Sequence, residues 1–134
     1  MTTYNIKSEE IYSDASAHRL ISDISGLIGA QTKHRILLAG DFNILNRYGE
    51  HSSKYWKDRY SSVFDRFNAI GISLIGPSYP NGRQATPWPD ELPKGSKCVP
   101  TYYHNRQTPE SATRQLDFVF ASKSIQATVA ALNG

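Results

Sequence analysis

The sequence predicts an α/β fold, in which helices pack against a sheet. Residues 17–28 and 54–69 repeat apolar side chains at spacings of three and four, as amphipathic helices do. Short apolar runs at residues 36–40, 72–75 and 115–122 are typical of strands. A length of 134 residues suits one domain with a buried core.

The composition is that of a globular protein, with 39% hydrophobic and 20% charged residues. The net charge of +3 suits a phosphate-bearing partner but is too small to indicate nucleic acid by itself. No apolar run approaches the ~18 residues of a membrane span, so we expect none. The single cysteine, Cys98, excludes an internal disulfide and fits a reducing compartment, so we expect a cytoplasmic protein.

The first half of the chain predicts two helices around one strand. Ser16 can cap the start of the first helix, and Gly29 its end. Because an all-apolar strand at residues 36–40 follows directly, we expect this strand to be covered on both faces. The second helix, at residues 54–69, has an apolar stripe and is terminated by Gly71.

The second half predicts a long loop and further strands. Residues 76–100 hold six of the seven prolines, which indicates an irregular loop of the kind that often carries function. We expect strands at residues 101–104 and 115–122, and a further short strand at 125–132. Within 115–122, Asp117 falls on the face opposite Phe118, where a carboxylate needs a partner or solvent.

The most informative stretch is residues 36–43, Ile-Leu-Leu-Ala-Gly-Asp-Phe-Asn. Residues two apart in a strand face the same side, so Asp41 and Asn43 are expected to project into one cleft while Phe42 turns into the core. A carboxylate and a carboxamide aimed at one point can hold a water molecule or a metal. The alternative is a simple turn, because Gly, Asp and Asn all favour turns.

Three segments in this order resemble the endonuclease/exonuclease/phosphatase superfamily of metal-dependent phosphoesterases: Leu-Leu-Ala-Gly-Asp-Phe-Asn at 37–43, Thr-Tyr at 101–102, and Arg-Gln-Leu-Asp-Phe-Val-Phe-Ala-Ser at 114–122. The resemblance implies that residues 1–134 form a single partial domain. Its expected architecture is half of a four-layer α/β sandwich, with a mixed, mostly antiparallel sheet flanked by helices.

The resemblance also implies roles for individual residues. Asp41 would orient and deprotonate the attacking water, Asn43 would hydrogen-bond a phosphoryl oxygen, and Asp117 would orient a catalytic histidine. The expected cofactor is Mg²⁺ or Mn²⁺, which Asp41 would contact through water. The expected substrate is a phosphoester, including nucleic acid, and the candidate phosphate-binding residues are Thr101, His104, Arg106 and Arg114.

Two further features of the family are missing from these 134 residues: its N-terminal glutamate ligand and its C-terminal Ser-Asp-His strand. The four histidines, at 18, 34, 51 and 104, match no catalytic position of the family. We therefore expect the chain alone to be inactive or nearly so. Half a sandwich would also leave an inner sheet face uncovered, including some of Leu37, Phe42, Val119 or Phe120, so we expect self-association or poor solubility.

A second hypothesis is a non-catalytic module that binds nucleic acid or a protein partner on the same scaffold. It rests on a set of basic and aromatic residues that could form one surface: Arg35, Arg47, Lys54, Arg83, Arg106 and Arg114, with Tyr48, Tyr102 and Tyr103. Ordinary solvated charge is the competing interpretation, and the modest net charge favours it.

Overall fold

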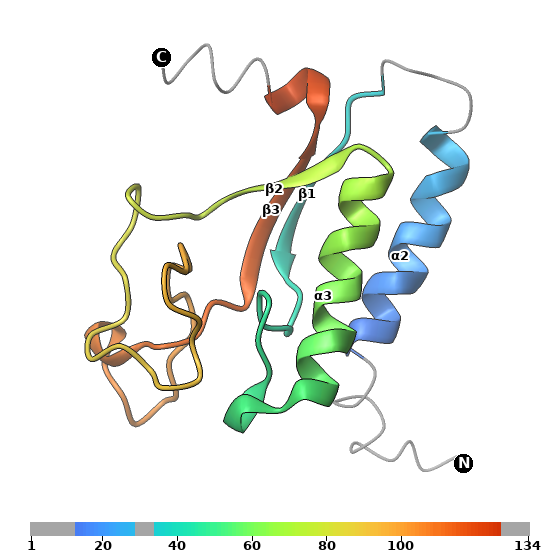
Figure 1. Cartoon of the computed structure of the whole chain (residues 1–134). Helices are drawn as coiled ribbons and strands as arrows, with labels where there is room; N and C mark the ends of the chain where they lie inside the picture. Colours follow the sequence, from blue (N-terminus) through green and yellow to red (C-terminus); the bar gives the residue numbers. More distant parts are fainter. Residues whose placement is uncertain (1–12, 29–33, 127–134) are drawn as a thin grey trace, which may run out of the picture.

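The computed structural model describes residues 13–28 and 34–126 and has the α/β fold that the sequence predicts. Its strands form one antiparallel sheet in the order β1-β3-β2. Both helices lie on one side of the sheet, and the long loop between β2 and β3 extends on the other (Figure 1). The elements are α2 (Ser13–Ile28), β1 (Leu37–Asp41), η1 (Glu50–Ser52), α3 (Lys54–Ala69), β2 (Ile72–Gly76), η2 (Pro109–Ser111) and β3 (Asp117–Ser122).

The second helix has the bounds that the sequence predicts. α3 begins after Ser53, whose hydroxyl oxygen accepts the Trp56 N–H at 3.3 Å, a standard N-cap bond. Just after its last residues the chain reaches Gly71, whose φ of +80° lies in the left-handed region that glycine tolerates best. Gly71, which the sequence predicts as the end of this helix, thus separates α3 from β2.

The first helix starts earlier than predicted. α2 already includes Ser13, so Ser16 lies within its first turns and is not its cap; the predicted end at Gly29 lies outside the described residues. The added turn is held by a tertiary contact, since Arg59 of α3 donates from Nε to Asp14 Oδ2 at 2.8 Å. The Asp14 side chain is only 5% exposed. An ion pair to another element cannot be found from helical periodicity alone.

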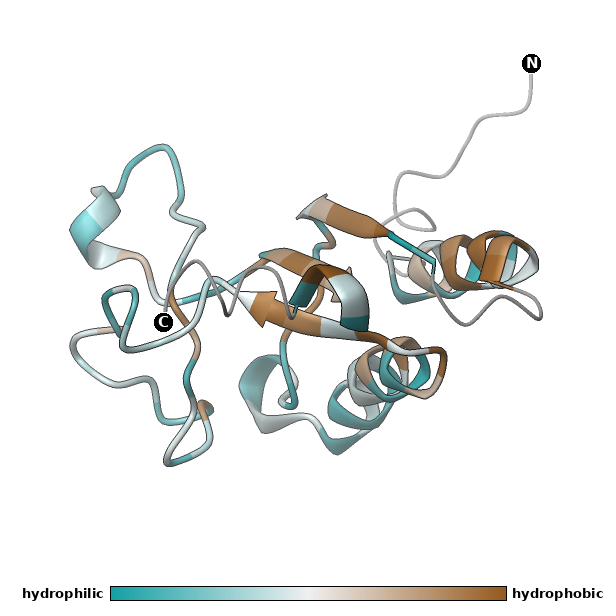
Figure 2. Cartoon of the chain, turned by 90° about the horizontal axis from the view of Figure 1, so that it is seen from above, coloured by the Kyte–Doolittle hydropathy of each residue, from teal (hydrophilic) through white to brown (hydrophobic). Residues whose placement is uncertain are grey.

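The core lies between the sheet and the two helices and is built on aromatic rings. Phe67 of α3 stacks on Phe120 of β3 with ring centroids 4.3 Å apart, and Phe42 meets Phe120 edge-on at 5.1 Å. Phe42 therefore turns into the core, as predicted. Figure 2 shows the hydrophobic strands against a mostly hydrophilic loop region.

The register of β1 against β3 decides which side chains face the core. The bonds from Phe42 N–H to the Leu116 carbonyl and from Ser122 N–H to the Ile36 carbonyl, both 2.9 Å, mark the even-numbered positions of β1 as hydrogen-bonded pairs. The odd-numbered positions are then non-hydrogen-bonded pairs, whose side chains lie on the face away from the core. Asp41 pairs with Asp117 in this register.

Three strand predictions need correction. β1 is not covered on both faces: Leu37 is 57% exposed, because both helices pack on the same side of the sheet. Residues 101–104 form only an isolated bridge, Tyr102 to Arg114. The N–H groups of Thr101 and Tyr102 both bond to the Arg114 carbonyl, so the ladder cannot extend. Residues 123–126 form a helical turn, and the rest of the strand predicted at 125–132 lies outside the described residues.

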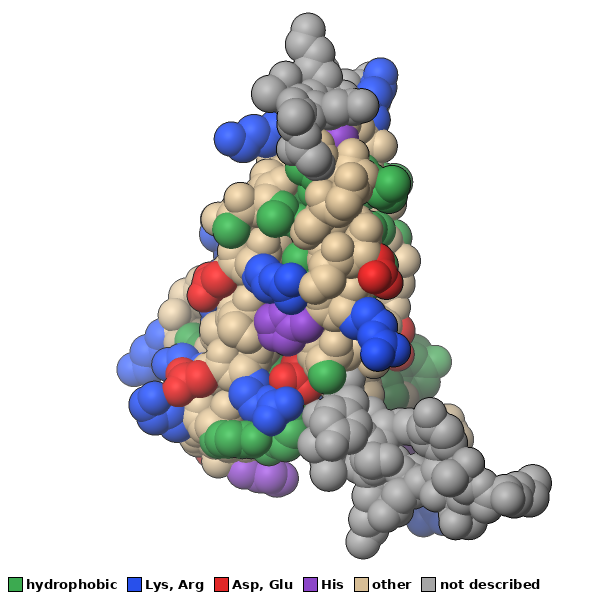
Figure 3. Space-filling model, turned by 90° about the vertical axis from the view of Figure 1, so that its right-hand side faces the viewer, with side chains coloured by type: hydrophobic (Ala, Val, Ile, Leu, Met, Phe, Trp, Pro, Cys, Tyr) green, Lys and Arg blue, Asp and Glu red, His purple; other side chains and the backbone are tan. Residues whose placement is uncertain are grey.

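Within residues 13–28 and 34–126, no helix has the length and apolar character needed to cross a bilayer. The two helices have 16 residues each. Their outward side, seen in Figure 3, carries basic and acidic side chains intermingled.

The packing of α2 on α3 includes a histidine, His18, whose two ring nitrogens both have partners on α3. Arg66 donates from Nη1 to His18 Nδ1 at 3.2 Å, so Nδ1 is the unprotonated ring nitrogen. His18 Nε2 lies 3.1 Å from the Ser62 hydroxyl, which itself donates to the Arg59 carbonyl and so accepts from the ring. Burial and then the positive charge of Arg66 lower the pKa of His18, against a smaller opposite effect of Asp14.

We expect the free energy of unfolding to decrease as the pH falls below about 6.5, the ordinary histidine pKa. In that range the unfolded chain binds a proton at His18 that the folded chain does not. The free energy of unfolding stops decreasing for this reason once the pH is below the pKa of His18 in the folded chain, because both states are then protonated. Urea denaturation between pH 5 and 8 measures this slope. His18→Gln should flatten it, with His104→Gln, in an exposed loop, as the control. An unchanged slope in His18→Gln would contradict the assignment.

Candidate functional site

The two acidic residues that the sequence singles out are cross-strand neighbours. Asp41 ends β1 and Asp117 begins β3, directly opposite each other in the antiparallel ladder. In a non-hydrogen-bonded pair the Cα atoms are about 4.5 Å apart and the side chains leave the sheet on the same face. Like charges directly opposite each other destabilise a sheet in general, so we expect this pair to cost folding free energy when no cation lies beside it.

Asn43 reaches the same place by a turn. Its N–H donates to Asp41 Oδ1 at 2.8 Å, and its φ of +51° is left-handed. The prediction that Asp41 and Asn43 alternate along one extended strand is therefore wrong, and the turn interpretation is correct. The physical reason is that an aspartate carboxylate can accept the backbone N–H of the residue two positions later, and this local hydrogen bond competes with extension of the strand. The same bond fixes one oxygen of the Asp41 carboxylate.

Thr101 fastens the long loop to the start of β3. Its hydroxyl oxygen accepts the N–H groups of Leu116 and Asp117, each at 3.1 Å, and its own N–H donates to the Arg114 carbonyl at 2.9 Å. The three segments that carried the family resemblance thus meet at one end of the sheet. Thr101 acts there on the backbone of Asp117, as a residue that positions it.

Gln115 is a positioning residue that the sequence reasoning missed. It is 2% exposed, its Oε1 accepts the Val99 N–H at 3.0 Å, and its Nε2 donates to the carbonyls of Pro77 at 2.9 Å and Asp117 at 3.3 Å. The amide therefore joins Pro77 and Val99, near the two ends of the proline-rich residues 76–100, to the start of β3. A glutamine directly before an apolar strand could have indicated this role, because an amide buried there needs several hydrogen-bond partners.

The other predicted phosphate-binding residues lie apart from the carboxylate pair. Arg114 Nη2 is 3.7 Å from Glu91 Oε1. His104 and Arg106 share an exposed turn, in which the Arg106 N–H lies 3.4 Å from His104 Nδ1. In the described part of the chain, no hydrogen bond or ion pair joins these three side chains to Asp41 or Asp117. The pair thus has no cationic side chain in contact with it there.

The donor set suits a hard cation that keeps part of its water shell. The register places the side chains of Asp41 and Asp117 on one face of the sheet, and the Asn43 backbone N–H donates to Asp41 Oδ1. Mg²⁺ is commonly held by one or two carboxylates together with waters and substrate phosphates. Among the residues described, no group of three or more His, Cys, Asp or Glu side chains could enclose a metal ion. The pair fits an open, weak site.

A hollow of about 440 Å³ adjoins the pair. We call it the edge hollow; it is lined by Ser13, Ser16, Ala17 and Leu20 of α2 and by residues 39–43. Asp41 and Asn43 are among its lining residues, so the hollow adjoins the end of β1 that carries the carboxylate pair.

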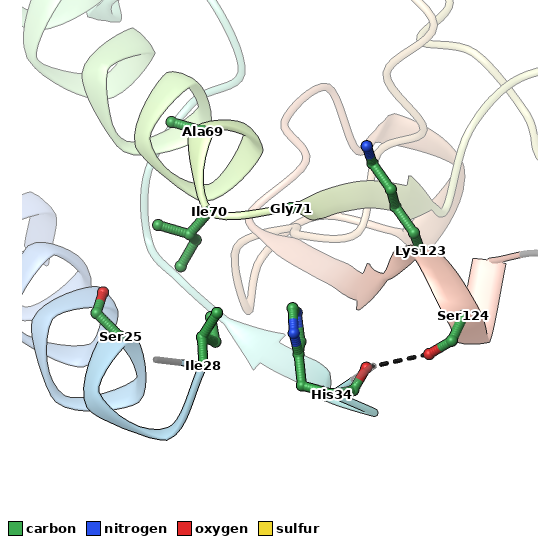
Figure 4. A pocket seen from close by; sticks show the side chains of 8 residues that line it. All are labelled: Ser25, Ile28, His34, Ala69, Ile70, Gly71, Lys123 and Ser124. Carbon is green, nitrogen blue, oxygen red and sulfur yellow. Dashed lines mark hydrogen bonds between the residues drawn. The ribbon is translucent and has the colours of Figure 1, made fainter. Parts of the chain in front are cut away.

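A second hollow, of about 480 Å³, lies at the opposite end of the sheet (Figure 4). It has no carboxylate in its lining, and Ser124 Oγ donates across its rim to the His34 carbonyl at 3.1 Å. Its lining residues are Ser25, Ile28, His34, Ala69, Ile70, Gly71, Lys123 and Ser124. The chemistry that the sequence indicates is therefore at the edge hollow and not at this larger one.

Comparisons with models of known families, with curated proteins and with solved structures found no match to this chain. The site is therefore interpreted from its own geometry.

Asp117→Asn should stabilise the metal-free protein by about 0.2–1 kcal/mol at low salt, because it removes like-charge repulsion from Asp41 without changing shape. Urea denaturation gives the free energy of unfolding, with the exposed Asp23→Asn on α2 as the control. Added Mn²⁺ should stabilise the wild type and not Asp117→Asn. Destabilisation by Asp117→Asn, with no response of the wild type to Mn²⁺, would contradict the pairing.

Proposed function

We propose that this chain carries part of a phosphodiester hydrolase site that works with Mg²⁺ or Mn²⁺. The observation that supports it best is the cross-strand pair of Asp41 and Asp117 with Asn43 beside it. Two carboxylates lie directly opposite each other in the ladder, an arrangement that a sheet does not favour by itself and that is typical of sites with a chemical role.

Each side chain has a task in this proposal. The Asp41 carboxylate, oriented by the Asn43 N–H, would accept the proton of the attacking water. The Asn43 amide would donate to a phosphoryl oxygen. A divalent cation, bound by the carboxylates of Asp41 and Asp117, would supply positive charge to the phosphate oxygens.

The role that the resemblance implies for Asp117, orienting a histidine, has no support in the described residues. No histidine among them is hydrogen-bonded to the Asp117 carboxylate. Its position opposite Asp41 supports instead a contact with the shared cation. With two carboxylates and no enclosing third ligand, we expect weak metal binding and turnover near the uncatalysed rate.

We also infer the finer architecture from the exposed side of β1. Leu37 and Ala39 are exposed on the face opposite the helices, which supports half of a four-layer α/β sandwich with one inner face open. Such a face favours self-association.

The single cysteine supports a reducing compartment such as the cytoplasm.

A second candidate is a nucleic-acid-binding module, and the exposed aromatic residues of the long loop favour it. Tyr79, Trp88, Tyr102 and Tyr103 are 37–47% exposed, and Arg83 and Arg106 lie on the same loop. Three members of the predicted basic set are in ion pairs: Arg47 pairs with Asp65 and Lys54 with Asp58, both at 2.6 Å, and Arg114 pairs with Glu91 at 3.7 Å. The basic surface is thus smaller than the sequence predicts.

Titration with a short single-stranded DNA carrying non-hydrolysable phosphorothioate links separates the two functions. The hydrolase proposal expects binding that requires Mn²⁺ and weakens about tenfold or more in Asp41→Asn, since one ligand charge is lost. Asp23→Asn is the control. We expect hydrolysis of bis(p-nitrophenyl) phosphate to stay near background.

Metal-independent binding that falls steeply with salt and persists in Asp41→Asn would contradict the hydrolase site and support the nucleic-acid module. Rapid hydrolysis that is lost in Asp41→Asn would support the site and overturn the expected low activity.

A further inference from the structure

We propose that β1 pairs edge to edge, antiparallel, with β1 of a second copy of this chain, centred on Ala39. This inference does not depend on the proposed function. In the β1-β3 ladder the even-numbered positions bond to β3, so the N–H and C=O groups of Leu37, Ala39 and Asp41 point to the free edge of the sheet. Among the described residues no segment pairs with this edge, so three residues of β1 offer a row of donors and acceptors there.

The two edges of the sheet differ in how they are protected. β2, the other edge strand, has an irregular register between Leu74 and Gly76 and is followed at once by Pro77, and bulges and prolines are devices that block strand addition. β1 pairs regularly over its whole length, and its sequence, Leu-Leu-Ala-Gly-Asp, contains no proline or lysine.

The β1 edge is also open. Four of its five residues are exposed and Leu38 is half-buried, whereas every residue of β2 is buried or half-buried. The edge hollow, of about 440 Å³, lies between residues 39–43 and α2 and leaves space beside the strand. An exposed, regular, apolar edge is a site for strand addition.

Charge complementarity identifies a second copy as the occupant. With Ala39 opposite the partner's Ala39, every outward-pointing position is paired, and Leu37 lies opposite the partner's Asp41. Arg35, exposed and in no ion pair in the described part of the chain, is then a diagonal neighbour of the partner's Asp41. The two-fold axis gives this contact twice and keeps the two Asp41 carboxylates apart.

The pairing has a consequence for the carboxylate pair. It joins two sheets into one of six strands, in the order β2-β3-β1-β1-β3-β2. It also brings the partner's Arg35 close to Asp41, which has no cationic side chain in contact with it within the described chain. A second copy would thus supply a positive charge that the site otherwise lacks.

Sedimentation equilibrium over a hundredfold concentration range tests the dimer. Leu37→Glu and Leu37→Lys are matched variants at a side chain that is already 57% exposed. In the proposed register residue 37 faces the partner's Asp41, so Leu37→Glu should weaken the dimer at least about tenfold relative to Leu37→Lys. Equal weakening by both variants would overturn this register, and a monomer throughout would overturn the dimer.

Hydrogen exchange identifies the occupant of the edge independently. The amides of Ala39 and Asp41 should be protected in proportion to the dimer population, and Ala39→Pro, which removes no bond to β3, should abolish dimerisation while circular dichroism shows a folded chain. Protection that does not change with concentration would show that another segment of the same chain covers the edge. That result, or no protection at any concentration, would overturn the proposal.

Discussion

The structure depends on one pairing, that of β1 with β3 in the register that sets Asp41 opposite Asp117. This register turns Phe118 and Phe120 toward the helices, where each is 1% exposed. It leaves the carboxylates on the other face. A slip of one residue would exchange the two faces of the strand and bury the charges, so the aromatic core fixes the acidic pair in place.

Local chemistry made part of this fold predictable. The apolar period of residues 54–69, with Ser53 before it and Gly71 after it, gives α3 at the observed bounds. Alternation in β3 correctly separates Asp117 from the core-facing phenylalanines. These features depend on the residue and its near neighbours, which a single sequence contains.

Long-range partners made the rest unpredictable. The early start of α2 depends on Arg59, and the failure of residues 101–104 to form a strand depends on one shared carbonyl at Arg114. The sequence motifs identified Asp41, Asn43 and Asp117 as site residues. They did not predict that the strand ends at Asp41, where the Asn43 N–H bonds to the Asp41 carboxylate and forms a turn. Two hydrogen-bond partners of Gln115 lie 16 and 38 residues away in the sequence, so they can be identified only from the folded loop.

In the proposed function, Asp41 and Asp117 bind a divalent cation together. The most direct measurement is paramagnetic broadening of amide NMR signals by substoichiometric Mn²⁺, read across the whole chain. We predict that the signals of Asp41, Asn43 and Asp117 broaden first and that those of His34 and Lys123, at the other end of the sheet, do not. Asp117→Asn should reduce the effect. Broadening centred elsewhere, or broadening at Asp41 that is unchanged in Asp117→Asn, would contradict this prediction.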